Sequence, residues 1–187
     1  MREVEVKIAL DDADDVRALL GRSGAVARTP RYFEDNRVYD DERGTLKTAG
    51  RLLRVRTIGS RNVLTFKRPE VGGDGSPRYK VRIEHETRIE DPEQLDEILV
   101  GLGFHVVYRY QKYRQRYTIG QQSIELDETP IGNFLELEGA PKAIDATAEK
   151  LGYSAEQYIT KTYRALHCEI CGLAEPGDLV FPADEAG

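Results

Sequence analysis

Cysteine and histidine are scarce in this sequence. The chain has two cysteines and three histidines, and Cys168 and Cys171 form a C-x-x-C motif directly after His167. A structural zinc site needs four ligands, and the sequence has no second Cys/His pair to complete one. Thioredoxin chemistry needs a βαβ context that the end of the chain does not offer. We therefore expect ordinary residues here, in a C-terminal extension over 167–187 to which the sequence assigns no role.

Long apolar runs and a dominant basic charge are also missing. No stretch approaches the roughly 18 apolar residues of a membrane span, and no apolar leader segment opens the chain. Charged residues make up 32% and hydrophobic residues 40% of the 187 positions, which is the balance of a globular domain. The net charge of −6 argues against a general nucleic-acid surface. We expect one cytoplasmic enzyme domain whose partners include no membrane and no nucleic acid polymer.

The common nucleotide-binding loops are absent as well. The glycine cluster at 72–75 lacks the Lys-Ser/Thr of a P-loop and the helix of a dinucleotide-binding fingerprint, so we expect a mobile loop between two strands. The three histidines stand at no spacing typical of a catalytic triad or a metal site. Phosphate binding, if present, must therefore use another arrangement.

Strand and helix periods alternate along the chain. Strict alternation predicts a strand over 2–10, and further strands are expected at about 31–39, 51–58, 62–68, 78–89, 104–119, 122–128 and 133–139. Helices are expected after Asp11 or Asp12 up to Gly24, from Pro92 to Gly103, at about 141–151 and at about 155–167. The order strand, helix, strand occurs over about 3–39 and again over about 80–117, which suggests a pseudo-symmetric sheet with helices on one side.

Most of the predicted strands place ionisable side chains on one face and apolar side chains on the other. The ionisable sets are Glu3, Glu5 and Lys7; Arg54 and Arg56; Lys67; Lys80, Arg82, Glu84 and Glu86; Lys112, Arg114 and Arg116; Glu125 and Asp127; and Glu136 and Glu138. Because the amphipathic helices must pack on the apolar face, the charged faces point the other way. Closure of the sheet would turn them into the lining of a tunnel and would remove the sheet edges.

Such a lining predicts a bound polyanion with metal ions. Buried cations need partners, and Lys and Arg bind phosphate oxygens well. Carboxylates without accompanying His or Cys suit Mg²⁺ or Mn²⁺ rather than zinc. A single charged strand face is usually just solvated, but repetition over seven strands favours a site for phosphoryl transfer, which depends on positioning and charge stabilisation.

The ordered motifs resemble the CYTH superfamily of triphosphate tunnel metalloenzymes, which includes class IV adenylate cyclases, thiamine triphosphatases and inorganic triphosphatases. The most specific motif is Glu3-Val4-Glu5-Val6-Lys7, and the resemblance covers about residues 2–166. The other motifs are Leu53-Arg54-Val55-Arg56, Leu64-Thr65-Phe66-Lys67, the strand with Arg82, Glu84 and Glu86, Lys112 with Arg114, Leu126-Asp127, Glu136-Leu137-Glu138 and Lys161-Thr162-Tyr163.

The resemblance implies an α+β fold, an eight-stranded antiparallel closed β-barrel with helices packed outside, as a catalytic domain over 1–166. Phosphate-binding residues would be Lys7, Arg54, Arg56, Lys67, Arg82, Lys112, Arg114 and Lys161, of which Lys67, Arg54 and Arg56 would act in catalysis. Ligands of Mg²⁺ or Mn²⁺ would be Glu3, Glu5, Glu86, Asp127, Glu136 and Glu138. Arg116 departs from the family pattern, and we expect it at the outside or the rim.

The implied activity is metal-dependent hydrolysis of a triphosphate: tripolyphosphate, ATP or thiamine triphosphate. Two alternatives stay open, an adenylate cyclase that uses the ATP 3′-hydroxyl in place of water, and a binding module without catalysis. The cyclase branch is associated with a His-Phe pair before the first motif, and its absence here favours the hydrolase. The sequence leaves the organic group, the preferred metal and the oligomeric state open.

Overall fold

The computed structural model describes residues 1–71 and 78–182, so the glycine cluster at 72–75 lies outside the described residues. All strand pairs are antiparallel. The strands are β1 (Arg2–Leu10), β2 (Val26–Ala27), β3 (Tyr32–Asp40), β4 (Leu52–Ile58), β5 (Arg61–Pro69), β6 (Lys80–Ile89), β7 (His105–Ile119), β8 (Gln122–Thr129) and β9 (Gly132–Glu138).

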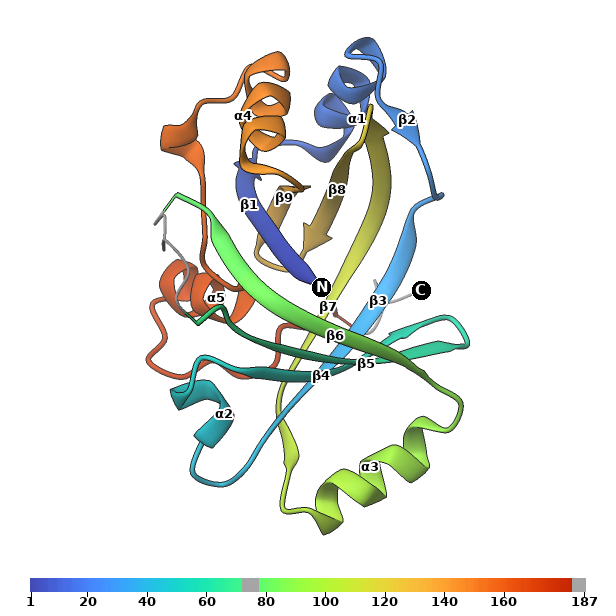
Figure 1. Ribbon diagram of the computed structural model, residues 1–187, viewed down its shortest axis with the longest axis vertical. Helices are drawn as coiled ribbons and strands as arrows, with labels where there is room; N and C mark the ends of the chain where they lie inside the picture. Colours follow the sequence, from blue (N-terminus) through green and yellow to red (C-terminus); the bar gives the residue numbers. More distant parts are fainter. Residues whose placement is uncertain (72–77, 183–187) are drawn as a thin grey trace.

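The sheet closes on itself into a barrel (Figure 1). Its strand order is β2-β7-β3-β4-β5-β6-β1-β9-β8, and β8 pairs back onto β7. The 15 residues of β7 make this closure possible, because the strand pairs with β3 over 105–114 and with β8 over 113–119. The eight-stranded antiparallel closed barrel that the resemblance implied is confirmed, with β2 as a short addition on β7.

The helices lie outside the barrel (Figure 1). They are α1 (Ala13–Arg22), α2 (Thr45–Thr48), α3 (Pro92–Gly101), α4 (Pro141–Lys150) and α5 (Tyr163–Cys171), with a 3₁₀ turn at Ala155–Gln157. Asp12 caps α1, since its carboxylate accepts the N–H groups of Asp14 and Asp15 at 2.7 and 3.0 Å. The expected helix over 155–167 is wrong in extent, because the backbone of Ile159 forms a β-bridge with Lys7 instead.

The main core fills the space between the barrel wall and helices α1 and α4. Val6 and Ile8 of β1 are fully buried there, together with Leu20 of α1 and Ile144 of α4. Complete burial of such a side chain contributes about 1.5–3 kcal/mol. Strand β1 is therefore buried on both faces, and its charged side chains lie in the barrel interior.

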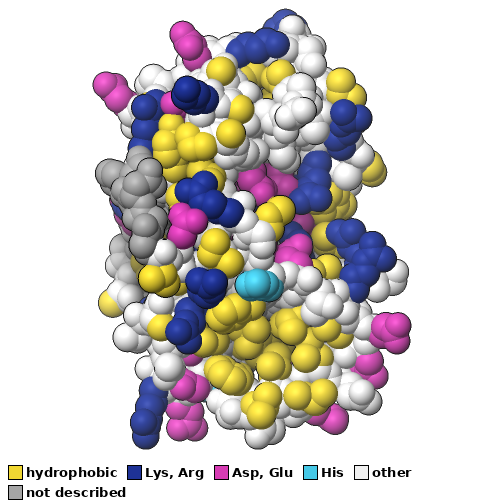
Figure 2. Space-filling view, in the orientation of Figure 1, with side chains coloured by type: hydrophobic (Ala, Val, Ile, Leu, Met, Phe, Trp, Pro, Cys, Tyr) yellow, Lys and Arg dark blue, Asp and Glu magenta, His cyan; other side chains and the backbone are white. Residues whose placement is uncertain are grey.

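The α3 stripe packs less completely than its sequence period predicts. Leu99 is buried, but Ile98 and Leu102 are 53% and 68% exposed. Figure 2 shows apolar side chains gathered over this end of the molecule. In the described residues no helix is long and apolar enough to cross a bilayer.

The C-terminal extension packs against the barrel. Helix α5 runs through position 166, where the sequence suggested a boundary, and ends at Gly172 in the left-handed conformation. Beyond it, Leu179 is buried and pairs with β7: its N–H donates to the carbonyl of Arg109, and the N–H of Gln111 donates to the carbonyl of Leu179, both at 2.8 Å. Residues 163–182 are thus held to the strand that closes the barrel.

Candidate active site

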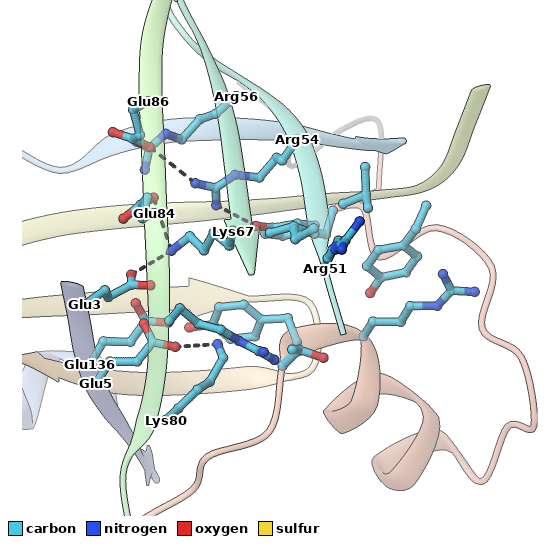
Figure 3. A pocket seen from close by; sticks show the side chains of 18 of the residues that line it. Glu3, Glu5, Arg51, Arg54, Arg56, Lys67, Lys80, Glu84, Glu86 and Glu136 are labelled. Atoms are coloured by element: carbon cyan, nitrogen blue, oxygen red, sulfur yellow. Dashed lines mark hydrogen bonds and ion pairs between the residues drawn. The ribbon is translucent and has the colours of Figure 1, made fainter. Parts of the chain in front are cut away.

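The barrel encloses a cavity of about 350 Å³ lined by charged side chains. All but two of the predicted site residues line it: Glu3, Glu5, Lys7, Arg54, Arg56, Lys67, Arg82, Glu86, Lys112, Arg114, Glu136 and Glu138. Figure 3 shows how several of them project into one space from different strands. The exceptions are Asp127 and Lys161.

Strand register explains how so many charges share one interior. Glu5 lies directly opposite Lys80, and Lys7 lies directly opposite Glu136. Directly opposed residues of an antiparallel pair have Cβ atoms roughly 4.5–5.5 Å apart, so each pair brings unlike charges together. The alternation of side chains along a strand decides which face of the sheet each residue occupies. The pairing register between neighbouring strands decides which charged residue stands opposite it.

The Glu3-x-Glu5-x-Lys7 motif is the centre of an ion-pair network. The Lys7 ammonium lies 3.0 Å from Glu5 Oε1 and 3.2 Å from Glu136 Oε1, and the Lys67 ammonium lies 2.6 Å from Glu3 Oε1. Burial opposes the charge on Lys7, but Glu136 and Glu5 outweigh it and raise the pKa of Lys7 above its usual value. Burial likewise opposes ionisation of Glu5, but Lys7 and other cations hold its pKa below the usual value. The network therefore stays charged at neutral pH.

Arg54 and Arg56 face the same cavity with different partners. Arg54 donates to the hydroxyls of Tyr110 at 2.9 Å and Thr65 at 3.3 Å, which are neutral groups. Arg56 donates to Glu86 Oε1 at 3.0 Å. The Nε atoms of both arginines are buried and have no hydrogen-bond acceptor among the described residues. Each guanidinium group therefore has one buried donor that the protein leaves unsatisfied.

Asp127 is a buried anchor of the wall. It is 0% exposed, and its carboxylate accepts from Lys112 at 2.8 Å, from Arg114 at 2.6 Å through two nitrogens, and from the Tyr163 hydroxyl at 2.6 Å. Arg114 also donates to Glu136 at 2.6 Å. Asp127 thus holds phosphate-binding candidates in place and does not itself line the cavity.

Lys161 lies outside the cavity. Its ammonium pairs with Glu169 on α5, and both side chains are more than half exposed. The residues that follow it, Thr162, Tyr163 and Arg164, line the cavity instead. Arg116 also lines it, at a rim position where its side chain is 43% exposed and pairs with Glu125.

Glu34 of β3 is an interior carboxylate that the sequence analysis missed. It is 0% exposed and lies 3.7 Å from Arg56 Nη1 and 3.8 Å from Lys112 Nζ. Burial would raise its pKa, but Lys112, Arg114 and Arg56 lower it to about 2. The sequence held one signal for it: Glu34 and Asn36 stand two positions apart and so share one face of their strand. In the structure both residues are fully buried.

Carboxylates crowd together around Glu138. Burial and the charges of Glu125, Glu3 and Glu5 raise the pKa of Glu138 to about 7, and no ion pair of Glu138 occurs among the described residues. Glu3, one of these neighbours, has its Oε2 atom buried without a hydrogen-bond partner among the described residues. Such crowding of oxygen donors fits a hard divalent cation.

The protein side chains alone do not form a complete binding site for a metal ion. Among the described residues, no three Asp, Glu, His or Cys side chains converge in a geometry that would hold a metal ion. The reason is that most interior carboxylates pair with Lys or Arg, as Glu5 and Glu136 do. Mg²⁺ commonly uses one or two carboxylates together with substrate phosphates and water, so the donor set suits an ion that arrives with its substrate.

Comparisons with known proteins agree with this architecture. A model of the CYTH domain matches residues 1–163. A protein of Methanocaldococcus jannaschii, provisionally named an adenylate cyclase, is 32% identical over 154 residues, which are 80% of this chain and 82% of that protein. A structure from Vibrio parahaemolyticus, also provisionally named an adenylate cyclase, superposes with a TM-score of 0.75 at 20% identity and covers 91% of this chain and 97% of its own.

A third structure shares the fold at lower identity. The structure of a Hippeastrum protein, described as an adenylyl cyclase candidate with a dominant triphosphatase activity, superposes with a TM-score of 0.61 at 16% identity over 93% of this chain and 98% of its own. The closed barrel with its charged interior, the family match over most of the chain and the archaeal relative together lead to one assignment: this chain belongs to the CYTH domain family.

Proposed function

We propose that this protein hydrolyses a triphosphate in the barrel interior with the help of a divalent metal ion. The observation that supports it is the charge of the cavity: among the described residues that line it, twelve are Lys or Arg and eight are Asp or Glu. The interior is therefore positive although the whole chain has a net charge of −6. An excess of positive charge in a low-dielectric cavity is costly unless a polyanion binds there.

The basic residues divide into two kinds by their present partners. Lys7 and Lys67 are paired with carboxylates, so phosphate oxygens must compete with Glu5 and Glu3 for them. Arg54 has mainly neutral partners and its closest carboxylate, Glu86, lies at 3.7 Å, so it can donate to phosphate without breaking a close ion pair. We assign Arg54, Arg56 and Lys67 to the stabilisation of charge that develops on the transferred phosphoryl group.

The carboxylates near Glu138 would hold the metal ion, with Glu3, Glu5 and Glu136 nearby as further oxygen donors. A bound Mg²⁺ or Mn²⁺ would neutralise phosphate charge and lower the pKa of a coordinated water. The protein's own part is to place the triphosphate between the basic wall and these carboxylates.

Adenylate cyclisation is the second candidate. It is favoured by the provisional names of the Methanocaldococcus and Vibrio relatives, whereas the Hippeastrum protein is described as mainly a triphosphatase. Both reactions need the same phosphate-binding residues and differ in the nucleophile. The nucleophile is water in triphosphate hydrolysis and the ribose 3′-hydroxyl in adenylate cyclisation. Product analysis therefore separates them.

The test is incubation of the purified protein with tripolyphosphate, ATP or thiamine triphosphate in the presence of Mg²⁺ or Mn²⁺. We expect release of phosphate or pyrophosphate from tripolyphosphate, and no cyclic AMP from ATP. Cyclic AMP with pyrophosphate as the main product would establish the cyclase. Tight binding of a triphosphate without any product under all of these conditions would instead support a binding module without catalysis.

A further inference from the structure

A second group of cations lines the cavity around α2, the start of β4 and the C-terminal segment. It consists of Lys47, Arg51, Arg82 and Arg164, which we call the basic vestibule. Arg82, which the resemblance assigned to the triphosphate, links this group to the tunnel, since it stands opposite Glu3 in the β1–β6 register and donates to the Gly50 carbonyl. In Figure 3 Arg51 lies across the cavity from Glu3 and Glu5.

One side of the vestibule is built by α2 and the start of β4. Asp40 holds α2 in place, since its carboxylate accepts the N–H groups of Leu46 and Lys47, each at 2.8 Å. Gly50 follows with φ of +65°, a conformation that favours glycine, and turns the chain into β4. Arg82 of β6 donates to the Gly50 carbonyl at 3.1 Å, which brings it beside this turn.

The other side is built by the C-terminal segment, beyond the 1–163 span of the family match. The Arg164 guanidinium lies 5.4 Å from the centre of the Tyr108 ring, within cation–π range. Glu175 bridges the two sides, at 2.7 Å from Arg164 and 2.9 Å from Lys47. The segment after α5 thus completes the vestibule.

The vestibule has more positive charge than its protein partners offset. Among the described residues, Glu175 is the one carboxylate in an ion pair with any of its four cations. The Glu175 side chain is 66% exposed, and exposed ion pairs contribute at most about 1 kcal/mol. An anionic ligand therefore meets little competition here. A cationic organic group, such as that of thiamine triphosphate, meets repulsion.

We propose that the basic vestibule binds a further phosphate group beyond the three held in the tunnel, so that chains of four phosphates bind better than chains of three. This inference rests on the proposed function, because it takes the tunnel as the triphosphate site. The chemistry is a phosphate in line with the first three, from an inorganic polyphosphate or from a nucleoside polyphosphate. Arg51 and Arg164 are its specificity residues.

The test measures affinity by isothermal titration calorimetry with Ca²⁺ in place of Mg²⁺, after phosphate release has been checked to be negligible, because a divalent cation is needed to offset the carboxylates that pair with the lysines. The ligands are tripolyphosphate and tetrapolyphosphate, with ATP and adenosine tetraphosphate as a second pair. We expect wild-type protein to bind the tetraphosphate of a pair about tenfold more tightly at low ionic strength, because the added phosphate meets several unscreened cations. A preference in the inorganic pair alone identifies inorganic polyphosphate as the source, and one in both pairs identifies the phosphate chain itself.

Arg51→Gln and Arg164→Gln should each reduce the tetraphosphate-to-triphosphate affinity ratio several-fold. Arg61→Gln is the matched control, since it removes the same charge from an exposed position on the same hairpin and should leave the ratio unchanged. Circular dichroism and thermal unfolding establish that each variant is folded. A ratio near one in wild-type protein, or a ratio that neither vestibule variant changes, overturns the inference. If tripolyphosphate is hydrolysed in that case, the proposed function survives its failure; if tripolyphosphate is neither bound nor hydrolysed, the proposed function fails.

Discussion

Arg54→Gln should separate transition-state stabilisation from folding. The side chain is 8% exposed, and its nearest partners are the hydroxyls of Tyr110 and Thr65. Its closest carboxylate, that of Glu86, lies at 3.7 Å and keeps Arg56 as a partner at 3.0 Å. Removal of the Arg54 charge therefore leaves no acidic group unpaired, and we expect the midpoint of thermal unfolding to change by only a few degrees.

The catalytic effect should be much larger. Loss of a single donor from a site that stabilises developing charge costs about 10²–10³ in kcat, or roughly 2.7–4 kcal/mol. We expect a fall in kcat for tripolyphosphate in that range with a smaller rise in KM, measured by phosphate release at saturating Mg²⁺. Arg61→Gln again serves as the control. An unchanged kcat with a raised KM would refute the assignment, because Arg54 would then contribute only uniform binding.

The remaining predictions concern stability, metal and position. Arg56→Gln should destabilise the fold by up to about 3 kcal/mol in urea unfolding, because it takes one of two cations from fully buried Glu34 and leaves Lys112 at 3.8 Å. The lowered pKa of Glu34, about 2, also predicts that wild-type stability falls as pH drops from about 4.5 toward 2, and Glu34→Gln should make that slope shallower, with the lowered pKa values of Glu5 and Glu136 accounting for the rest. EDTA should abolish hydrolysis. Burial and neighbouring carboxylates raise the pKa of Glu138 to about 7, and we propose that it binds metal as the carboxylate; half-maximal activity should therefore need less Mg²⁺ at pH 8 than at pH 6, and Glu138→Gln should abolish this difference. Lys161→Ala should change KM less than twofold whereas Lys67→Ala raises it strongly, and a strong effect of Lys161→Ala would contradict its placement outside the cavity.

Alternation along the strands was enough to predict which residues face inward. In β1 apolar and charged residues alternate from Glu3 to Ile8, and burial on both faces follows from that order once helices cover one side. Closure was not contained in the same pattern, because an open sheet shows the same alternation. It depends on β7 being long enough to pair with both β3 and β8. The family resemblance predicted the closure of the barrel, and the pairing of β7 with both β3 and β8 explains it.

The errors occur where periodicity gives no signal. Helix α2 has four residues and β2 has two, lengths too short to show a period. Lys161 follows an irregular stretch in which Ile159 bridges to Lys7, so neither strand nor helix spacing indicates its direction. Glu34 stands alone as a charge on its strand face, beside Asn36, and a single charge does not distinguish an interior from a solvated face.

Charge balance in the barrel explains why the proposed function needs carboxylates and metal together. Glu5 and Glu136 neutralise Lys7, which allows these charges to remain buried at all. In the proposed reaction phosphate oxygens would take over the lysine, and those carboxylates would be left buried and unpaired. A divalent cation that arrives with the triphosphate would restore the balance, since such an ion can bind carboxylate and phosphate oxygens at once. The acidic residues thus stabilise the buried lysines and, in the proposed reaction, would create the need for a metal ion.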